Sequence, residues 1–146
     1  MSKGKIQDWH GCPTRYAAGI LADKWCFLIL RDALLHGKRT YSEFLNSPEG
    51  VSTNILADRL AKLEATGMLD RQIDPRKASR VCYFPTRKAR DILPALLALM
   101  VWSTRHDQFT DAPESFAQAY NDDPVATVNW YEKEIDRVDA SIKGSE

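Results

Sequence analysis

The sequence predicts a mainly α-helical fold with a small antiparallel β-wing of two or three strands. Apolar residues recur at helical spacing from Val51 onward, and the pattern stops at Gly67. Apolar and polar residues then alternate over Met68–Ile73, a charged turn follows, and a second strand is expected over Val81–Phe84. A one-sided helix followed directly by a basic hairpin is the order found in a winged helix-turn-helix.

Two helices are expected at the start of the domain. Small and apolar residues recur at helical spacing over Thr14–Asp23. The stretch Trp25–Leu35 is apolar on almost every side, with Arg31 and Asp32 as its only charges, so we expect a buried central helix. It stops at Gly37, a residue type that commonly ends helices.

Capping residues mark the two helices of the predicted helix-turn-helix. Thr40 and Glu43 have the spacing of a capping box, which places a short helix at residues 41–46. Ser52 is suited to cap the next helix, and the apolar side of that helix is formed by Ile55, Leu56, Leu60 and Leu63. Its other side is polar, so residues 52–66 are predicted to be the recognition helix.

In the second strand we expect Val81 and Tyr83 to face inward and Cys82 to face outward. Thr86 is predicted to cap one long helix that reaches about residue 106. Pro94 should bend this helix, because proline removes a backbone donor.

The remainder of the chain is predicted to be a helical extension. Asp111 and Glu114 have capping-box spacing, and Asp123 followed by Pro124 indicates the start of a last helix to about Ile142. We therefore expect a loose arm at residues 1–11, a winged helix-turn-helix domain at 12–107 and an acidic helical extension at 108–146. There is no internal repeat.

The net charge is zero, but it is unevenly distributed. Residues 1–111 contain 17 basic and 12 acidic residues, whereas residues 112–146 contain 3 and 8. Between Arg71 and Arg90 one acid, Asp74, accompanies seven bases: Arg71, Arg76, Lys77, Arg80, Arg87, Lys88 and Arg90. A local basic patch is what attracts a phosphate backbone. The alternative is an ordinary solvated strand pair.

Several classes of function are disfavoured by the sequence. The apolar run 92–102 contains Pro94 and is too short to span a bilayer, and no secretion signal is apparent, so we expect a cytosolic protein. Three cysteines without a CxxC pair argue against a disulfide framework and a zinc site, and we expect neither metal nor cofactor. Nucleotide-binding and hydrolase motifs are absent, so an enzyme is not expected.

The chain resembles the HxlR family of bacterial winged-helix regulators, relatives of the MarR group. The resemblance covers about residues 12–106 and is carried by the stretches CPTRYAAGILADKWCFLILRDAL, RTYSEFLNSPEGVSTNILADRLAKLEATGMLDR and RVCYFPTRKARDILPALLALMVWSTRH. It implies a homodimer, joined through the first and last helices of the domain, that binds double-stranded operator DNA and changes transcription. The helix after Thr86 has more apolar surface than one small domain can cover, which also favours a dimer. The alternative is that the extension covers this surface, but burial of one face alone would leave Trp102 or Leu97 exposed. The sequence YFPTRKARD departs from the usual start of the last family helix.

DNA contacts are predicted in three places. They are the short helix start (Thr40, Tyr41, Ser42), the recognition helix (Ser52, Thr53, Asn54, Arg59) and the turn of the wing (Arg76, Lys77, Ser79, Arg80). Asn54 could bind an adenine edge and Arg59 a guanine or a phosphate, although Arg59 could instead pair with Asp58 or Glu64. Asp58 would repel phosphate unless a base pairs with it. A winged module that binds protein is the competing interpretation.

An effector is also suggested. Several relatives sense oxidants through a cysteine near the first helix, and Cys12 precedes a helix start, where the dipole favours thiolate. The alternative is a buried cysteine that fills space. Cys26 is expected to be inert. Aromatic residues that could line a small-molecule pocket between the dimer helices are Trp25, Phe27, Trp102, Phe109, Phe116 and Trp130, although such residues are more often core.

Overall fold

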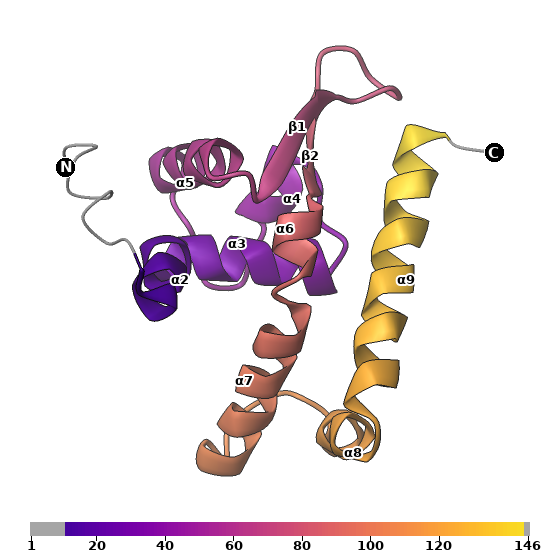
Figure 1. Cartoon of the computed structure of the whole chain (residues 1–146). Helices are drawn as coiled ribbons and strands as arrows, with labels where there is room; N and C mark the ends of the chain where they lie inside the picture. Colours follow the sequence, from indigo (N-terminus) through magenta and orange to yellow (C-terminus); the bar gives the residue numbers. More distant parts are fainter. Residues whose placement is uncertain (1–10, 145–146) are drawn as a thin grey trace.

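The computed structural model describes residues 11–144 and has the fold of a winged helix-turn-helix with a helical extension (Figure 1). The predicted N-terminal arm lies almost wholly outside the described residues. The elements are α2 (Pro13–Leu21), α3 (Lys24–Leu35), α4 (Tyr41–Leu45), α5 (Thr53–Ala65), β1 (Leu69–Ile73), β2 (Val81–Pro85), α6 (Arg87–Arg90), α7 (Leu93–His106), α8 (Glu114–Asp122) and α9 (Pro124–Lys143).

Helix α3 is the centre of the domain, as its apolar sequence predicted. Leu30 and Leu34 are buried and belong to one cluster with Leu56, Leu60 and Leu63 of α5. The apolar stripe therefore docks α5 on the core, and the polar side of α5 faces outward. Burial of five leucines at about 1.5–3 kcal/mol each is the main force that holds this pair of helices together.

The hairpin pairs β1 with β2 in antiparallel register, with Arg71 opposite Tyr83. Beyond β2 an isolated bridge joins Thr40 to Cys82, and the Tyr83 amide donates to the Arg39 carbonyl at 2.7 Å. The sheet thus has two strands, with a third segment touching its free edge. This agrees with the predicted wing of two or three strands.

Tyr83 packs against the main core as predicted, but the prediction that Cys82 is open to solvent was wrong. Cys82 is completely buried, whereas Val81 and Tyr83 are only partly buried. The reason is that helix α9 covers the face that was expected to be open: Cys82 and Phe84 form a second apolar cluster with Ile142, against which Val138 packs. Both faces of β2 are therefore covered, one by the main core and one by the extension.

The predicted long helix after Thr86 is two helices. Thr86 does cap the first, α6, which ends at Arg90, and α7 begins after Ile92. Pro94 lies in the first turn of α7, where its missing N–H has no helical partner to lose. The proline therefore starts a helix rather than bending one.

The extension folds back along the domain. Helix α8 begins after Pro113, with no side-chain cap, so the predicted start at Asp111 was wrong. Asp123 caps α9 as expected, accepting the Ala126 amide at 3.0 Å. Figure 1 shows α7 projecting away from α3, α8 at the foot of α9, and α9 running back toward the wing.

Candidate nucleic-acid interface

The N-terminal turn of α5 is open to solvent. Ser52, Thr53 and Asn54 are all exposed, and the Ser52 hydroxyl accepts the Ile55 amide at 3.3 Å. Thr53 and Asn54 thus project from a helix start whose free amides and dipole favour an anion. The geometry has the features that the sequence predicted for a recognition helix.

Helix α4 is fastened to this turn. The full capping box of Thr40 and Glu43 is present, and the Tyr41 hydroxyl donates to the Thr53 carbonyl at 3.1 Å. Tyr41 and Ser42 are exposed, but Thr40 is only 4% exposed and its hydroxyl bonds Glu43 at 3.0 Å. Thr40 therefore fixes the start of α4, while its two neighbours face solvent.

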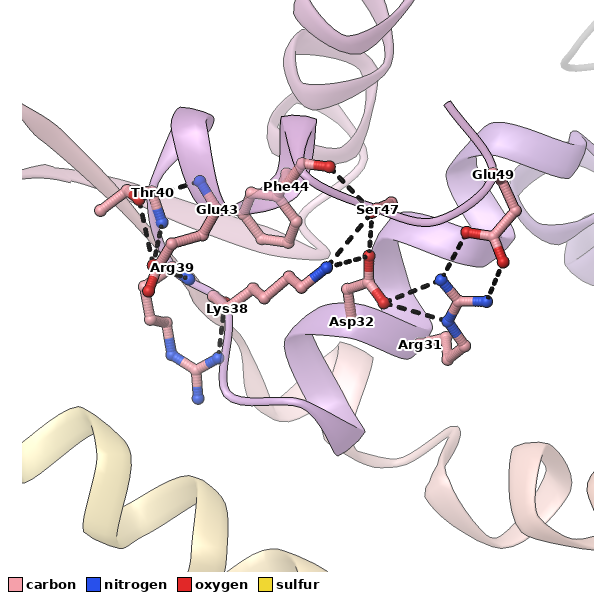
Figure 2. A network of polar contacts seen from close by, with 9 residues as sticks. All are labelled: Arg31, Asp32, Lys38, Arg39, Thr40, Glu43, Phe44, Ser47 and Glu49. Carbon is pink, nitrogen blue, oxygen red and sulfur yellow. Dashed lines mark hydrogen bonds and ion pairs between the residues drawn. The ribbon is translucent and has the colours of Figure 1, made fainter. Parts of the chain in front are cut away.

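A buried polar network holds the loop that leads into α5 (Figure 2). Asp32 is 1% exposed. Its carboxylate accepts hydrogen bonds from Ser47 Oγ at 2.5 Å, Arg31 Nε at 3.0 Å and Lys38 Nζ at 3.2 Å. Arg31 reaches on to Glu49 with two bonds of 2.8 Å, and these hydrogen bonds lower the pKa of Glu49 to about 2. The loop is thereby tied to the central helix from which α5 takes its orientation.

This network was missed by the sequence analysis, although a signal was present. Arg31 and Asp32 are adjacent opposite charges within an otherwise apolar buried helix. Charged side chains are seldom fully buried unless they are paired, so their presence there could have predicted an internal ion pair. The partners Ser47 and Glu49 lie 15 and 18 residues away and had no local signature.

Arg59 is held by two carboxylates. Its Nε donates to Asp23 at 3.0 Å and its Nη1 to Asp58 at 2.7 Å. Asp58 was one of the expected partners, while Asp23, the cap of α3, was not foreseen. Although burial acts in the opposite direction, bonds from the Cys26 amide and Arg59 lower the pKa of Asp23. Arg59 thus links α5 to the loop before α3 and neutralises Asp58.

The wing turn is organised around a buried acid. Asp74 is 1% exposed and receives Arg76 Nε at 3.0 Å and Arg80 Nε at 2.7 Å. These bonds, with Arg76 first, hold the pKa of Asp74 far below its usual range, against the effect of burial. The side chains of both arginines remain 40–45% exposed, and Lys77 and Ser79 are exposed at the tip.

The basic residues at the base of the wing, Arg87, Lys88 and Arg90, bind other parts of the chain and not the turn. Arg87 binds Glu132 of α9 at 2.8 Å, and Arg90 binds Glu132 at 2.5 Å and Asp136 at 2.8 Å. Lys88 donates to the Thr66 carbonyl at 2.7 Å. The seven bases therefore do not form one patch: the extension and the end of α5 engage three of them.

The three cysteines differ in access. Cys12 is exposed at the start of α2, where its Sγ accepts the Arg15 amide at 3.5 Å. Cys26 is fully buried, and burial raises the pKa of its thiol to about 11. Burial also raises the pKa of Cys82. Of the three thiols, Cys12 is the one that a solute can reach directly.

Two features are absent from residues 11–144. No helix in this range is long and apolar enough to cross a membrane. The same residues contain no group of three His, Cys, Asp or Glu side chains placed to hold a metal ion.

Comparison with known proteins agrees with this arrangement. Residues 20–111 match the HxlR-like helix-turn-helix family. A helix-turn-helix transcriptional regulator from Synechocystis sp. is 37% identical over 90 residues, which are 62% of this chain and 66% of the relative, just under two thirds. Another from Methanothermobacter thermautotrophicus is 30% identical over 65% of this chain and 72% of its own.

Solved structures of transcription factors and regulators are also similar to this chain. The crystal structure of PA1607 has a TM-score of 0.64, 30% identity and 74% coverage of each chain. The reduced form of the transcriptional regulator YodB from Bacillus subtilis has a TM-score of 0.55 and 25% identity, over 68% of this chain and 98% of that one. The oxidised redox regulator HypR, at 23% identity and a TM-score of 0.57, covers 65% of this chain and 97% of its own and shows a shared fold.

Proposed function

We propose that this chain, which belongs to the HxlR-like helix-turn-helix family and is a transcriptional regulator of that type, acts as a homodimer on specific operator DNA. Residues 12–107 would bind DNA and dimerise, and residues 108–146 would support them. The observation that carries the proposal is the exposed start of α5, held in a fixed orientation by the Asp32 network. A protein that binds operator DNA acts where the DNA is, so the proposed location is the cytosol.

The proposed contacts divide into base recognition and backbone positioning. Thr53 and Asn54 enter the major groove, where an asparagine amide can bind an adenine edge. Backbone contacts come from Tyr41, Ser42, Ser52, Arg76, Lys77, Ser79 and Arg80. Arg59 binds DNA only with the part of its guanidinium that Asp23 and Asp58 leave free, and Thr40 acts by fixing α4.

Dimerisation is supported by apolar surface on α2 and α7. Leu97 is fully buried by the chain itself, but Trp102 is 57% and Leu99 is 49% exposed on the same helix. Tyr16 on α2 is 60% exposed and lines an apolar hollow of about 290 Å³ between α2 and the α6–α7 segment. The extension therefore covers one side of α7 and leaves another open, and exposed aromatic surface of this kind marks an interface.

Selection from random duplex DNA tests the proposal directly. The purified protein should sediment as a dimer and enrich two related half-sites about 10 base pairs apart, as two recognition helices on one duplex face require. Asn54→Ala should weaken the preference at one position of each half-site, and Asn129→Ala, an exposed amide on α9, should not. A monomer that enriches no sequence would refute both parts of the proposal.

We propose in addition that oxidants act through Cys12. Its thiol is exposed at a helix start, and YodB has been solved in reduced and diamide-treated forms. Oxidation would alter operator affinity in the wild-type protein, and Cys12→Ser would remove that response. An equal response of both proteins to the oxidant would rule out this role.

A further inference from the structure

A cleft of about 160 Å³ lies between the end of α3 and the middle of α9. Its apolar wall includes Leu34, Ile135 and Val138, and Trp130, which is 58% exposed, lies at the solvent side. A cavity of about 150 Å³ with apolar walls can hold a benzene ring. The space is therefore sufficient for a small ring or a branched aliphatic group.

The floor of the cleft contains a buried cation with one unused donor group. Arg39 is 0% exposed. Its Nε donates to Asp139 at 2.8 Å, and its Nη1 donates to the carbonyls of Ala33 and Lys38, both at 2.8 Å. Its Nη2 is the only buried side-chain nitrogen or oxygen without a hydrogen-bond partner within residues 11–144. Figure 2 shows the guanidinium turned away from the Asp32 network and toward α9.

Arg39 is ion-paired with Asp139, but its burial still disfavours the charged guanidinium. Burial lowers the pKa of Arg39 in spite of the opposing effect of Asp139, although an arginine side chain remains charged. At the rim of the cleft, Arg137 and Glu134 bind each other with bonds of 3.1–3.3 Å and so largely cancel. A buried donor that lacks an acceptor is costly, and a ligand oxygen would complete the hydrogen bonding of Nη2, most strongly if that oxygen belongs to an anion.

We propose that this cleft binds a small organic acid. Its carboxylate would accept from Nη2 of Arg39, and an apolar body about the size of one benzene ring would lie against Ile135, Val138 and Trp130. The proposal does not depend on DNA binding, because the cleft is formed within one chain and away from the recognition helix.

Calorimetric titration of the DNA-free protein tests the proposal with three probes. Benzoate should bind saturably with one site per chain. Benzamide, which has the same ring but no charge, should bind about tenfold more weakly or worse, the ratio expected when a charge-assisted bond is replaced by a neutral one. Inorganic phosphate, which has charge but no apolar body, should not compete.

Variants on the two sides of the cleft should act in opposite directions. Val138→Phe fills the apolar space without removing Arg39 and should abolish binding. Asp139→Asn keeps an oxygen for Nε but removes the built-in negative charge, so benzoate should bind about threefold more tightly or better. Lys133→Gln removes an exposed cation of α9 that does not line the cleft and should change nothing. Circular dichroism and thermal melting confirm that each variant is folded.

Three results would overturn the proposal. They are no benzoate binding by the folded wild-type protein, equal binding by the Val138→Phe variant, and equal affinity for benzoate and benzamide. Competition by inorganic phosphate would show that the site takes an inorganic anion without an apolar body, which also contradicts the proposal. None of these results bears on operator recognition, which is measured separately.

Discussion

The wing provides the sharpest quantitative prediction, because its cations differ in how far they are already neutralised. Arg76 and Arg80 share the buried carboxylate of Asp74, whereas Lys77 is exposed at the tip and its side chain has no ion pair within the described part of the chain. Replacing Lys77 with alanine removes a whole positive charge without disturbing the Asp74 cluster. Its backbone bonds, to Asp74 and from Arg80, are retained.

The magnitude follows from counterion release. One phosphate contact contributes about 0.9 to the slope of log K against log salt, and a dimer presents two wings, so Lys77→Ala should reduce the slope by about 1.8. Over a rise from about 50 to 200 mM salt, the ratio of wild-type to variant affinity should therefore shrink by about tenfold. The loss should be similar for specific and random DNA, because a phosphate contact carries no base information.

Fluorescence anisotropy with a labelled duplex at four or five salt concentrations measures both slopes. Lys133→Ala is the matched control, since this lysine is also exposed but lies on α9. If Lys77→Ala and Lys133→Ala have the same slope as the wild type, Lys77 does not contact phosphate. The assignment of the wing to the DNA backbone would then be refuted.

Three further predictions concern reactivity and stability. Iodoacetamide should modify Cys12 well before Cys26 in the native protein, because burial raises the pKa of Cys26 to about 11; peptide mass spectrometry showing equal rates would contradict this. Leu63→Ala should lower the free energy of unfolding by about 2–5 kcal/mol in urea denaturation, because Leu63 is fully buried; a loss below about 0.5 kcal/mol, the range of surface changes, would exclude a core role. Arg31 lowers the pKa of Glu49 from 4.5 to about 2, so the stability contributed by this pair is complete above pH 4.5 and is lost as the pH falls toward 2. Glu49→Gln should flatten that part of the pH profile of stability, and an unchanged profile would show that the pair contributes nothing.

Much of the fold could be predicted because its signals are local. The cap at Ser52, the capping box at Thr40 and the stripe that ends at Gly67 each depend on residues within about two turns of one another. The start of α9 after Asp123 was predicted for the same reason. Periodicity and capping are properties of short segments, so the sequence contains them directly.

The errors share a long-range cause. An alternating strand does not say whether its outer face will be covered by residues more than 50 positions later, and so Cys82 was expected to be exposed when Val138 and Ile142 cover it. The break before Pro94 depends on how α6 and α7 each pack, since proline is compatible with both a bend and a start. The acidic partner of Arg39 lies 100 residues away, beyond any local pattern.

The same consideration changes how the basic cluster should be understood. A count of the bases between residues 71 and 90 assumes that they form one positively charged surface. In the fold, several of them pair with acids, some of which come from elsewhere in the chain. Glu132 engages Arg87 and Arg90, and Asp74 draws the side chains of Arg76 and Arg80 together. The positive charge at the tip of the wing therefore depends less on the number of cations in the segment than on which of them are paired with acids. Asp74, at the centre of the turn, fixes Arg76 and Arg80 and neutralises part of their charge. Helix α9, at the base, neutralises Arg87 and Arg90 through Glu132. Lys77 at the tip keeps a charge that no acid within the described residues neutralises, and under the proposed function this is where the hairpin would hold a phosphate backbone.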